Sequence, residues 1–140
     1  MPGASRLVHS ARETPLWVMT SNLSEAPAAM KLGAAGAQVV RVPTTTTPPP
    51  GLDLPAVLHA LAEKGISRLL VEGGARIASS FVAAGLADEV WLLRGINPVG
   101  ADGVPALEAM PLSAITQSPA FKVRASETLQ NDTLTIFERT

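Results

Sequence analysis

The sequence contains no cysteine and no tyrosine, and aromatic residues make up only 4% of its 140 residues. The lack of cysteine excludes disulfides and any thiolate metal site, and it fits a reducing compartment such as the cytoplasm. The 11 Lys and Arg residues are balanced by 12 Asp and Glu residues and form no basic cluster. Without a basic patch or aromatic side chains for base stacking, we expect no nucleic-acid surface.

Long apolar runs are also missing. No segment approaches the ~20 apolar residues needed to cross a bilayer, and the first six residues lack the apolar core of a signal peptide. We expect His9 and His59 to be surface histidines, and we expect no metal site. These absences predict a cytoplasmic protein that does not interact with membranes.

What is present is a chain that is 46% hydrophobic and long enough for one domain, predicted to span residues 1–140. Segments rich in apolar and β-branched residues, typical of strands, alternate along the chain with segments whose apolar residues have helical spacing. Strands are predicted at residues 16–20, 37–42, 68–72 and 89–94, and helices begin near Ser24, Asp53 and Ala75. Helical crossovers between strands predict a largely parallel sheet and the α/β fold class.

Caps and turns define where several of these elements begin and end. Ser24 and Asp53 are predicted N-caps, each with a proline in the following turn, and Gly65 and Gly85 are predicted C-terminal stops. Residues 44–50, with four Thr and three Pro, are predicted to be an exposed connector.

The last third of the chain has a different pattern. Residues 95–119 are rich in Gly and Pro, and a short helical turn is predicted at 106–110. Alternating residues at 121–125 and 133–138, with a turn near 130–132, predict an antiparallel hairpin at the end of the sheet.

Residues 71–90 are the segment with the clearest chemistry: a strand end, two glycines, a short helix, a glycine stop and a new strand. Ligands of open α/β sheets bind at the carboxyl ends of the strands, where Glu72 lies. Gly73 and Gly74 allow unusual φ angles and close backbone approach, so the N–H groups of residues 74–77 can point at a phosphate. Ser79 and Ser80 could add hydroxyl contacts.

Taken alone, this pattern is weak. Two glycines between a strand and a helix are usually only a tight turn, Glu72 can be a solvated acid, and Arg76 can be an exposed helix cation. The segment is neither a G-x-G-x-x-G fingerprint nor a P-loop, because residues 76 and 78 are Arg and Ala and no Gly-Lys-Ser/Thr follows.

The same segment resembles the C-terminal reductase domain of the bacterial bifunctional riboflavin-biosynthesis deaminase–reductase. The resemblance rests on V-E-G-G-A at 71–75 and A-G-L-A-D-E at 84–89, and it extends to Pro98-Val99-Gly100 and the final hairpin. It implies a dihydrofolate-reductase-like fold of three layers, α-β-α, and NADPH as cofactor. The family reaction reduces 5-amino-6-(5-phosphoribosylamino)uracil to the ribitylamino product, a small-molecule substrate.

The resemblance also assigns roles to residues, without naming a catalytic one. It implies that Glu72 binds the substrate, and that Thr20 or Ser21, at the end of the first strand, contacts the cofactor. The remaining cofactor-binding residues that it implies are Gly73, Gly74, Ala75, Arg76, Ile77, Ala78, Ser79 and Ser80.

The chain differs from the family in its N-terminal part. Family domains begin with a strand carrying an S-L-D-G-like motif, which has no match here, so the chain resembles about the last two-thirds of a reductase domain. A deep cleft or an unpaired strand edge would follow. An exposed apolar edge is a liability, and we expect self-association, as a dimer, to cover it.

Three interpretations stay open: a catalytically incomplete reductase piece, a working enzyme completed by a partner copy or segment, and a non-catalytic oligomerisation or regulatory module. Another dihydrofolate-reductase-like reductase is a competing family assignment. Those reductases carry a similar Gly-Gly turn, often with Gly in place of Glu72.

Overall fold

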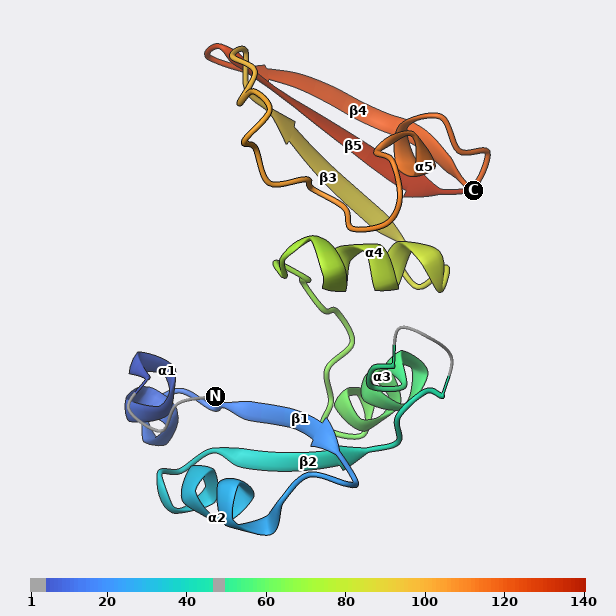
Figure 1. Ribbon diagram of the computed structural model, residues 1–140. Helices are drawn as coiled ribbons and strands as arrows, with labels where there is room; N and C mark the ends of the chain where they lie inside the picture. Colours follow the sequence, from blue (N-terminus) through green and yellow to red (C-terminus); the bar gives the residue numbers. More distant parts are fainter. Residues whose placement is uncertain (1–4, 47–49) are drawn as a thin grey trace. The chain divides into compact units, whose positions relative to one another are not determined.

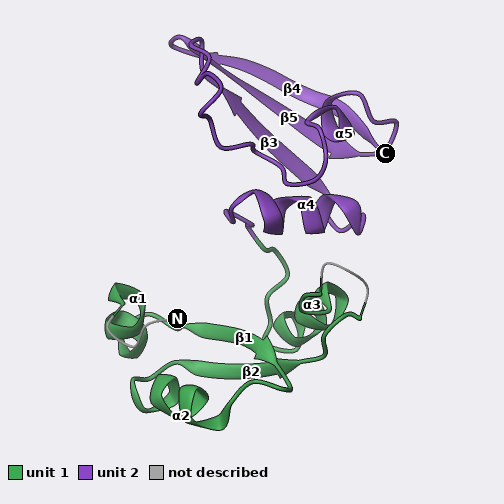
Figure 2. Ribbon diagram, viewed as in Figure 1, with its two compact units in different colours: residues 1–69 green, residues 70–140 purple. Residues whose placement is uncertain are grey.

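The computed structural model describes residues 5–46 and 50–140 (Figure 1). The chain forms two compact units, residues 1–69 and 70–140 (Figure 2). The assignment of residues 1–140 to one domain stays a prediction.

The first unit is built on a parallel pair of strands, β1 (Trp17–Ser21) and β2 (Gln38–Val42), in which Trp17 lies opposite Gln38. Helix α2 (Ala26–Ala34) connects the two strands, as the alternating pattern predicted. Two short elements before β1, helix α1 (Arg6–His9) and the 3-10 turn η1 (Ser10–Arg12), were not predicted.

The core of the first unit lies between these strands and helix α3 (Leu54–Ala62). Val57 and Leu61 of α3 are buried against Val42 of β2, whereas Leu54 and Leu58 are half-buried. Val57 and Leu61, one helical turn apart, therefore form the buried face of α3.

The N-caps of the two nine-residue helices of the first unit, α2 and α3, differ from each other. The Asp53 side chain accepts a hydrogen bond from the Ala56 N–H at 2.9 Å, so this predicted cap is confirmed. The prediction for Ser24 is wrong: Glu25 is the N-cap residue of α2, and the Ser24 hydroxyl donates to the Ser21 carbonyl. Serine can bond to nearby backbone groups in a turn as readily as it caps a helix.

Loss of the Asp53 cap should measurably destabilise α3. We expect Asp53→Ala to lower the free energy of unfolding by about 1 kcal/mol, because the Ala56 N–H loses its acceptor. Asp53→Asn, which keeps an oxygen at the cap, should lose less than half of that. Urea unfolding followed by circular dichroism measures both values, and an unchanged midpoint for Asp53→Ala would contradict the role of the cap.

The second unit contains helix α4 (Ala75–Ala83) and the strands β3 (Glu89–Arg94), β4 (Phe121–Leu129) and β5 (Asp132–Arg139). The strands form one antiparallel sheet in the order β3-β5-β4. The predicted hairpin is confirmed, and Gln130 adopts a φ of 56° in its turn. Gly85, with a φ of 64°, follows α4 as the predicted stop.

Strand pairing confirms the mixed α/β class but differs from the expected, largely parallel sheet. Among the strands of the described residues, only β1 and β2 are parallel, and β3 pairs antiparallel with β5. The strand predicted at residues 68–72 is wrong: within the described residues this segment belongs to no sheet, and Leu70 is 80% exposed. Without that strand, β3 has no parallel neighbour, and it pairs with β5 of its own unit.

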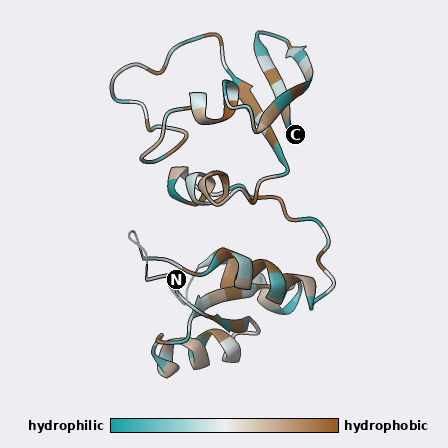
Figure 3. Ribbon diagram, turned by 90° about the vertical axis from the view of Figure 1, so that its right-hand side faces the viewer, coloured by the Kyte–Doolittle hydropathy of each residue, from teal (hydrophilic) through white to brown (hydrophobic). Residues whose placement is uncertain are grey.

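The core of the second unit is formed by Leu107, Ile115 and Phe137, with Ala78 and Val82 of α4 packed against it. Figure 3 shows alternating hydrophobic and hydrophilic positions along strands of the sheet. Burial does not follow a strict alternation, since the adjacent Ile136 and Phe137 of β5 are both buried. The helical turn predicted at residues 106–110 is wrong. Residues 106–110 form a series of bends with Leu107 buried in the core, and the short helix of this region is α5 (Ser113–Thr116).

The predicted connector at residues 44–50 lies partly outside the described residues, since 47–49 are not described. Thr44, its first residue, forms an antiparallel bridge with Leu52, which lies two residues beyond its end. Among the helices in the described ranges, none has both the length and the apolar character needed to span a membrane.

Candidate functional site

The glycine turn leads directly into α4. Glu72 and Gly73 are exposed, and Gly74 is the N-cap residue of α4, with φ −64° and ψ 175°. The Gly74 carbonyl accepts the first helical hydrogen bonds, from the N–H groups of Ile77 and Ala78. No side chain caps this helix end. A helix N-terminus that carries no side-chain cap offers N–H donors and a favourable dipole to an anion.

The two glycines serve different purposes. A Cβ built on Gly73 would overlap the Cγ2 of Ile77, so close packing against α4 requires glycine at this position. A Cβ on Gly74 would meet no atom within 4 Å, so the space beside this backbone is open. Neither glycine has a positive φ. The missing side chains matter instead: at Gly73 the backbone packs closely against Ile77, and at Gly74 the backbone borders open space.

The two predicted serine contacts are engaged within the protein. The Ser80 hydroxyl donates to the Arg76 carbonyl at 2.9 Å, inside α4. The Ser79 hydroxyl accepts a hydrogen bond from the Glu108 N–H at 2.7 Å. Arg76 itself is exposed on the first turn of the helix. The cofactor roles of these three residues stay predictions.

Thr20 and Ser21 lie at the end of β1 in the first unit, where both are half-buried. Thr20 stands opposite Arg41 of β2 in the strand register. Their predicted contact with the cofactor stays a prediction. The remaining predicted site residues, 72–80, are continuous in sequence and belong to the second unit.

Sequence reasoning did not find the part of the loop that lies against α4. The Glu108 N–H bonds to the Ser79 hydroxyl and approaches the Ala75 carbonyl at 3.4 Å. The next residue, Ala109, has a φ of 58°, a conformation that non-glycine residues rarely adopt. No local motif marks this contact, because its two sides are 29 residues apart.

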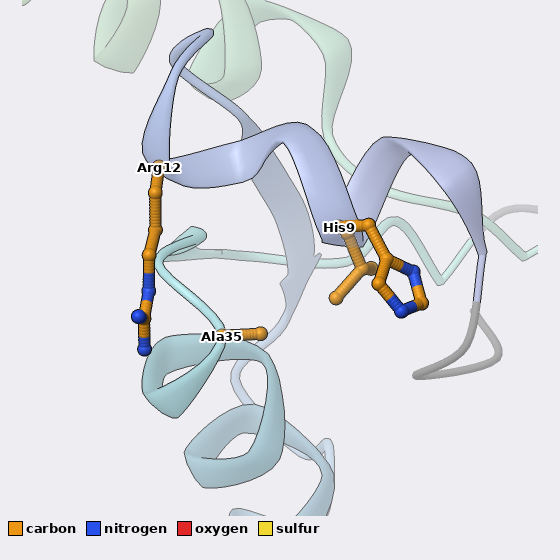
Figure 4. Close-up of a pocket in the computed structure, with 4 residues that line it drawn as sticks. His9, Arg12 and Ala35 are labelled. Carbon is orange, nitrogen blue, oxygen red and sulfur yellow. The ribbon is translucent and has the colours of Figure 1, made fainter.

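The first unit has an open hollow of about 260 Å³, lined by Val8, His9, Arg12 and Ala35 (Figure 4). Its polar side chains are used locally: Arg12 donates to the Ala34 carbonyl at the end of α2, and His9 Nδ1 donates to the Ser5 carbonyl. His9 and His59 are exposed, as predicted. The described residues contain no group of three or more His, Cys, Asp or Glu side chains that could hold a metal ion.

Comparison with solved structures gives the class of fold. RibD of Acinetobacter baumannii matches the whole chain with a TM-score of 0.73 and 19% identity, over 35% of its own length. A pyrimidine reductase-like protein from Corynebacterium diphtheriae matches 89% of the chain with a TM-score of 0.66 and 18% identity, over 50% of its own length. The protein therefore has the fold of the matched parts of RibD and of the pyrimidine reductase-like protein.

The family follows from the sequence comparison: residues 3–135 match the RibD C-terminal domain, and the chain belongs to this family. The riboflavin biosynthesis protein RibD of Bacillus amyloliquefaciens is 34% identical over 93 residues, which cover 66% of this chain and 24% of the relative. The protein of the same name from Chlamydia trachomatis is 36% identical over 89 residues, which cover 62% and 23%. The aligned part thus spans about a quarter of the length of these relatives.

Proposed function

We propose that this chain contributes to the reductase step of riboflavin biosynthesis: the NADPH-dependent reduction of 5-amino-6-(5-phosphoribosylamino)uracil to the ribitylamino product. Membership in the RibD C-terminal domain family supports the pathway, and two relatives are named for riboflavin biosynthesis. The observation that carries the proposal is the α4 N-terminus, which has no side-chain cap and lies beside the open space at Gly74. We place the protein in the cytoplasm.

The residues at the turn fit a phosphate-bearing cofactor. The N-terminal amides of α4 donate to phosphate oxygens, and the helix dipole adds a favourable charge interaction. The absence of a Cβ at Gly74 lets the cofactor approach the backbone closely. Bound NADPH supplies the hydride, so the contribution of the chain is to bind and orient the reactants.

Glu72 is the proposed substrate residue. Its carboxylate is exposed directly before the turn, where it can accept hydrogen bonds from ribose hydroxyls or from donors on the base. An ionised acceptor forms stronger hydrogen bonds than a neutral one.

The test of the proposal is a calorimetric titration of the 140-residue chain with NADPH and with NADH. We expect saturable binding and a preference for NADPH. No heat of binding at millimolar cofactor would overturn the proposed cofactor site.

Glu72→Ala separates the substrate from the cofactor. We expect it to weaken substrate binding about tenfold, equivalent to about 1.4 kcal/mol, because a charge-assisted hydrogen bond is lost. NADPH binding should stay within about twofold of the unsubstituted protein, since the carboxylate is not a phosphate ligand. Separate titrations with each ligand give both constants, and an equal loss of both would rule out the role assigned to Glu72.

A second candidate function is a non-catalytic oligomerisation module. On the sheet of the second unit, Trp91 and Leu93 are 63% and 59% exposed on one face of β3. Burial of such an apolar face by a second copy is favourable, and we propose a homodimer as the assembly. Dimerisation without saturable NADPH binding would favour this function over the reductase.

A further inference from the structure

The loop between β3 and α5 is hydrogen-bonded to α4 near its C-terminal end, at Glu108. The Glu108 N–H donates to the Ser79 hydroxyl at 2.7 Å and also approaches the Ala75 carbonyl at 3.4 Å. The neighbouring Leu107 is buried in the core of the second unit. Ala75 is the first residue of α4 and follows Gly74, so this fastening lies beside the proposed cofactor turn.

Ser79 is unusual among the polar residues of the chain. It is the only buried polar side chain within the described ranges, with 8% of its surface exposed. The adjacent Ser80 bonds to the carbonyl four residues before it, which is the common arrangement for a helical serine. The hydroxyl of Ser79 instead accepts a hydrogen bond from a residue 29 positions away. A buried hydroxyl used in this way fixes tertiary structure.

The backbone next to this contact is strained. Ala109 has a φ of 58°, and the left-handed conformation costs a non-glycine residue about 1 kcal/mol. Such conformations persist where the surrounding structure holds them, and they are concentrated at functional sites. Here the holding groups are the Ser79–Glu108 hydrogen bond on one side and the packed Met110 on the other.

The same loop exposes three apolar side chains, Ile96, Val99 and Val104, which are 70%, 87% and 90% exposed. The end of the loop at Glu108 is held against the first turn of α4, while these side chains are free of the core. An apolar segment attached beside a ligand site is suited to contact the ligand once it is bound.

We propose that Ser79 is a positioning residue: its hydroxyl holds the 95–112 loop against the first turn of α4 and so shapes the cofactor site without touching the cofactor. This assignment rests on the proposed function and differs from the direct contact that the family resemblance implied for Ser79. In the present structure the hydroxyl is buried and its acceptor oxygen is directed to Glu108.

The test combines Ser79→Ala with amide hydrogen exchange and NADPH titration on the 140-residue chain. We expect exchange at Glu108 to become about tenfold faster and the Kd for NADPH to rise about five- to tenfold, in line with the loss of one buried hydrogen bond. Ser79→Thr, which keeps the hydroxyl, should restore both values. Ser118→Ala is the matched control, because it also removes a hydroxyl that accepts a backbone N–H, from Ala120.

Each outcome separates the possibilities. Weaker NADPH binding with unchanged exchange at Glu108 would make Ser79 a direct ligand and overturn the positioning role. Faster exchange with an unchanged Kd would limit Ser79 to a structural role and also overturn it. If the unsubstituted chain binds no NADPH, the proposed function fails together with this coupling, whereas the exchange measurement still reports whether Ser79 holds the loop.

Discussion

Gly74→Val should weaken NADPH binding about a hundredfold, equivalent to about 2.8 kcal/mol, while leaving the fold intact. The branched side chain would occupy the open space beside the turn, which the cofactor needs for close approach to the backbone. The fold should tolerate valine, because Gly74 has a φ of −64° and its Cβ would meet no atom within 4 Å. Calorimetric titration with NADPH gives the affinity, and circular dichroism checks the fold.

Gly51 offers a matched control for this substitution. It also lacks a positive φ, a Cβ added to it would meet no atom within 4 Å, and it lies outside the predicted site. Gly51→Val should therefore leave the Kd for NADPH unchanged. If Gly74→Val bound NADPH with normal affinity, the cofactor would not approach the backbone at this turn, and the proposed site would be wrong.

Phe137→Ala should lower the free energy of unfolding of the second unit by about 3–5 kcal/mol. Phe137 is 5% exposed and belongs to the core cluster of this unit, so removing its ring leaves a cavity beside Leu107 and Ile115. A loss of this size is a large part of the stability of a typical domain. Urea unfolding measures it, with Trp91 as the fluorescent reporter after Trp17→Phe removes the other tryptophan.

Val123→Ala is the control for this measurement. Val123 lies opposite Phe137 in the register of β4 and β5 but is largely exposed, so its truncation should change the stability by less than about 1 kcal/mol. Equal losses for Phe137→Ala and Val123→Ala would show that the Phe137 ring does not hold this core together.

Local rules predicted much of the fold. Asp53 caps α3, Gly85 ends α4, and the alternation at the end of the chain forms a hairpin. These features depend on residues within a few positions of one another. The helix start after the two glycines was found in the same way, but no strand precedes the turn, so Glu72 does not lie at a strand end as expected.

Features that depend on distant partners were not predictable in this way. The segment at residues 68–72 has the composition of a strand, but a strand forms only where another strand accepts its hydrogen bonds. Because residues 68–72 form no strand, β3 pairs with β5 instead, and this pairing is antiparallel. The requirement for glycine at position 73 comes from the side chain of Ile77, which composition alone does not reveal.

Short-range patterns in the chain were enough to predict the α/β class, the family resemblance and the position of the candidate cofactor turn. Three features emerged only in the folded protein: which strands pair, which of the two glycines has open space beside it, and the hydrogen bond from the Glu108 N–H to the Ser79 hydroxyl. The physical reason is that hydrogen bonds and close packing between residues far apart in the chain exist only once the chain has folded.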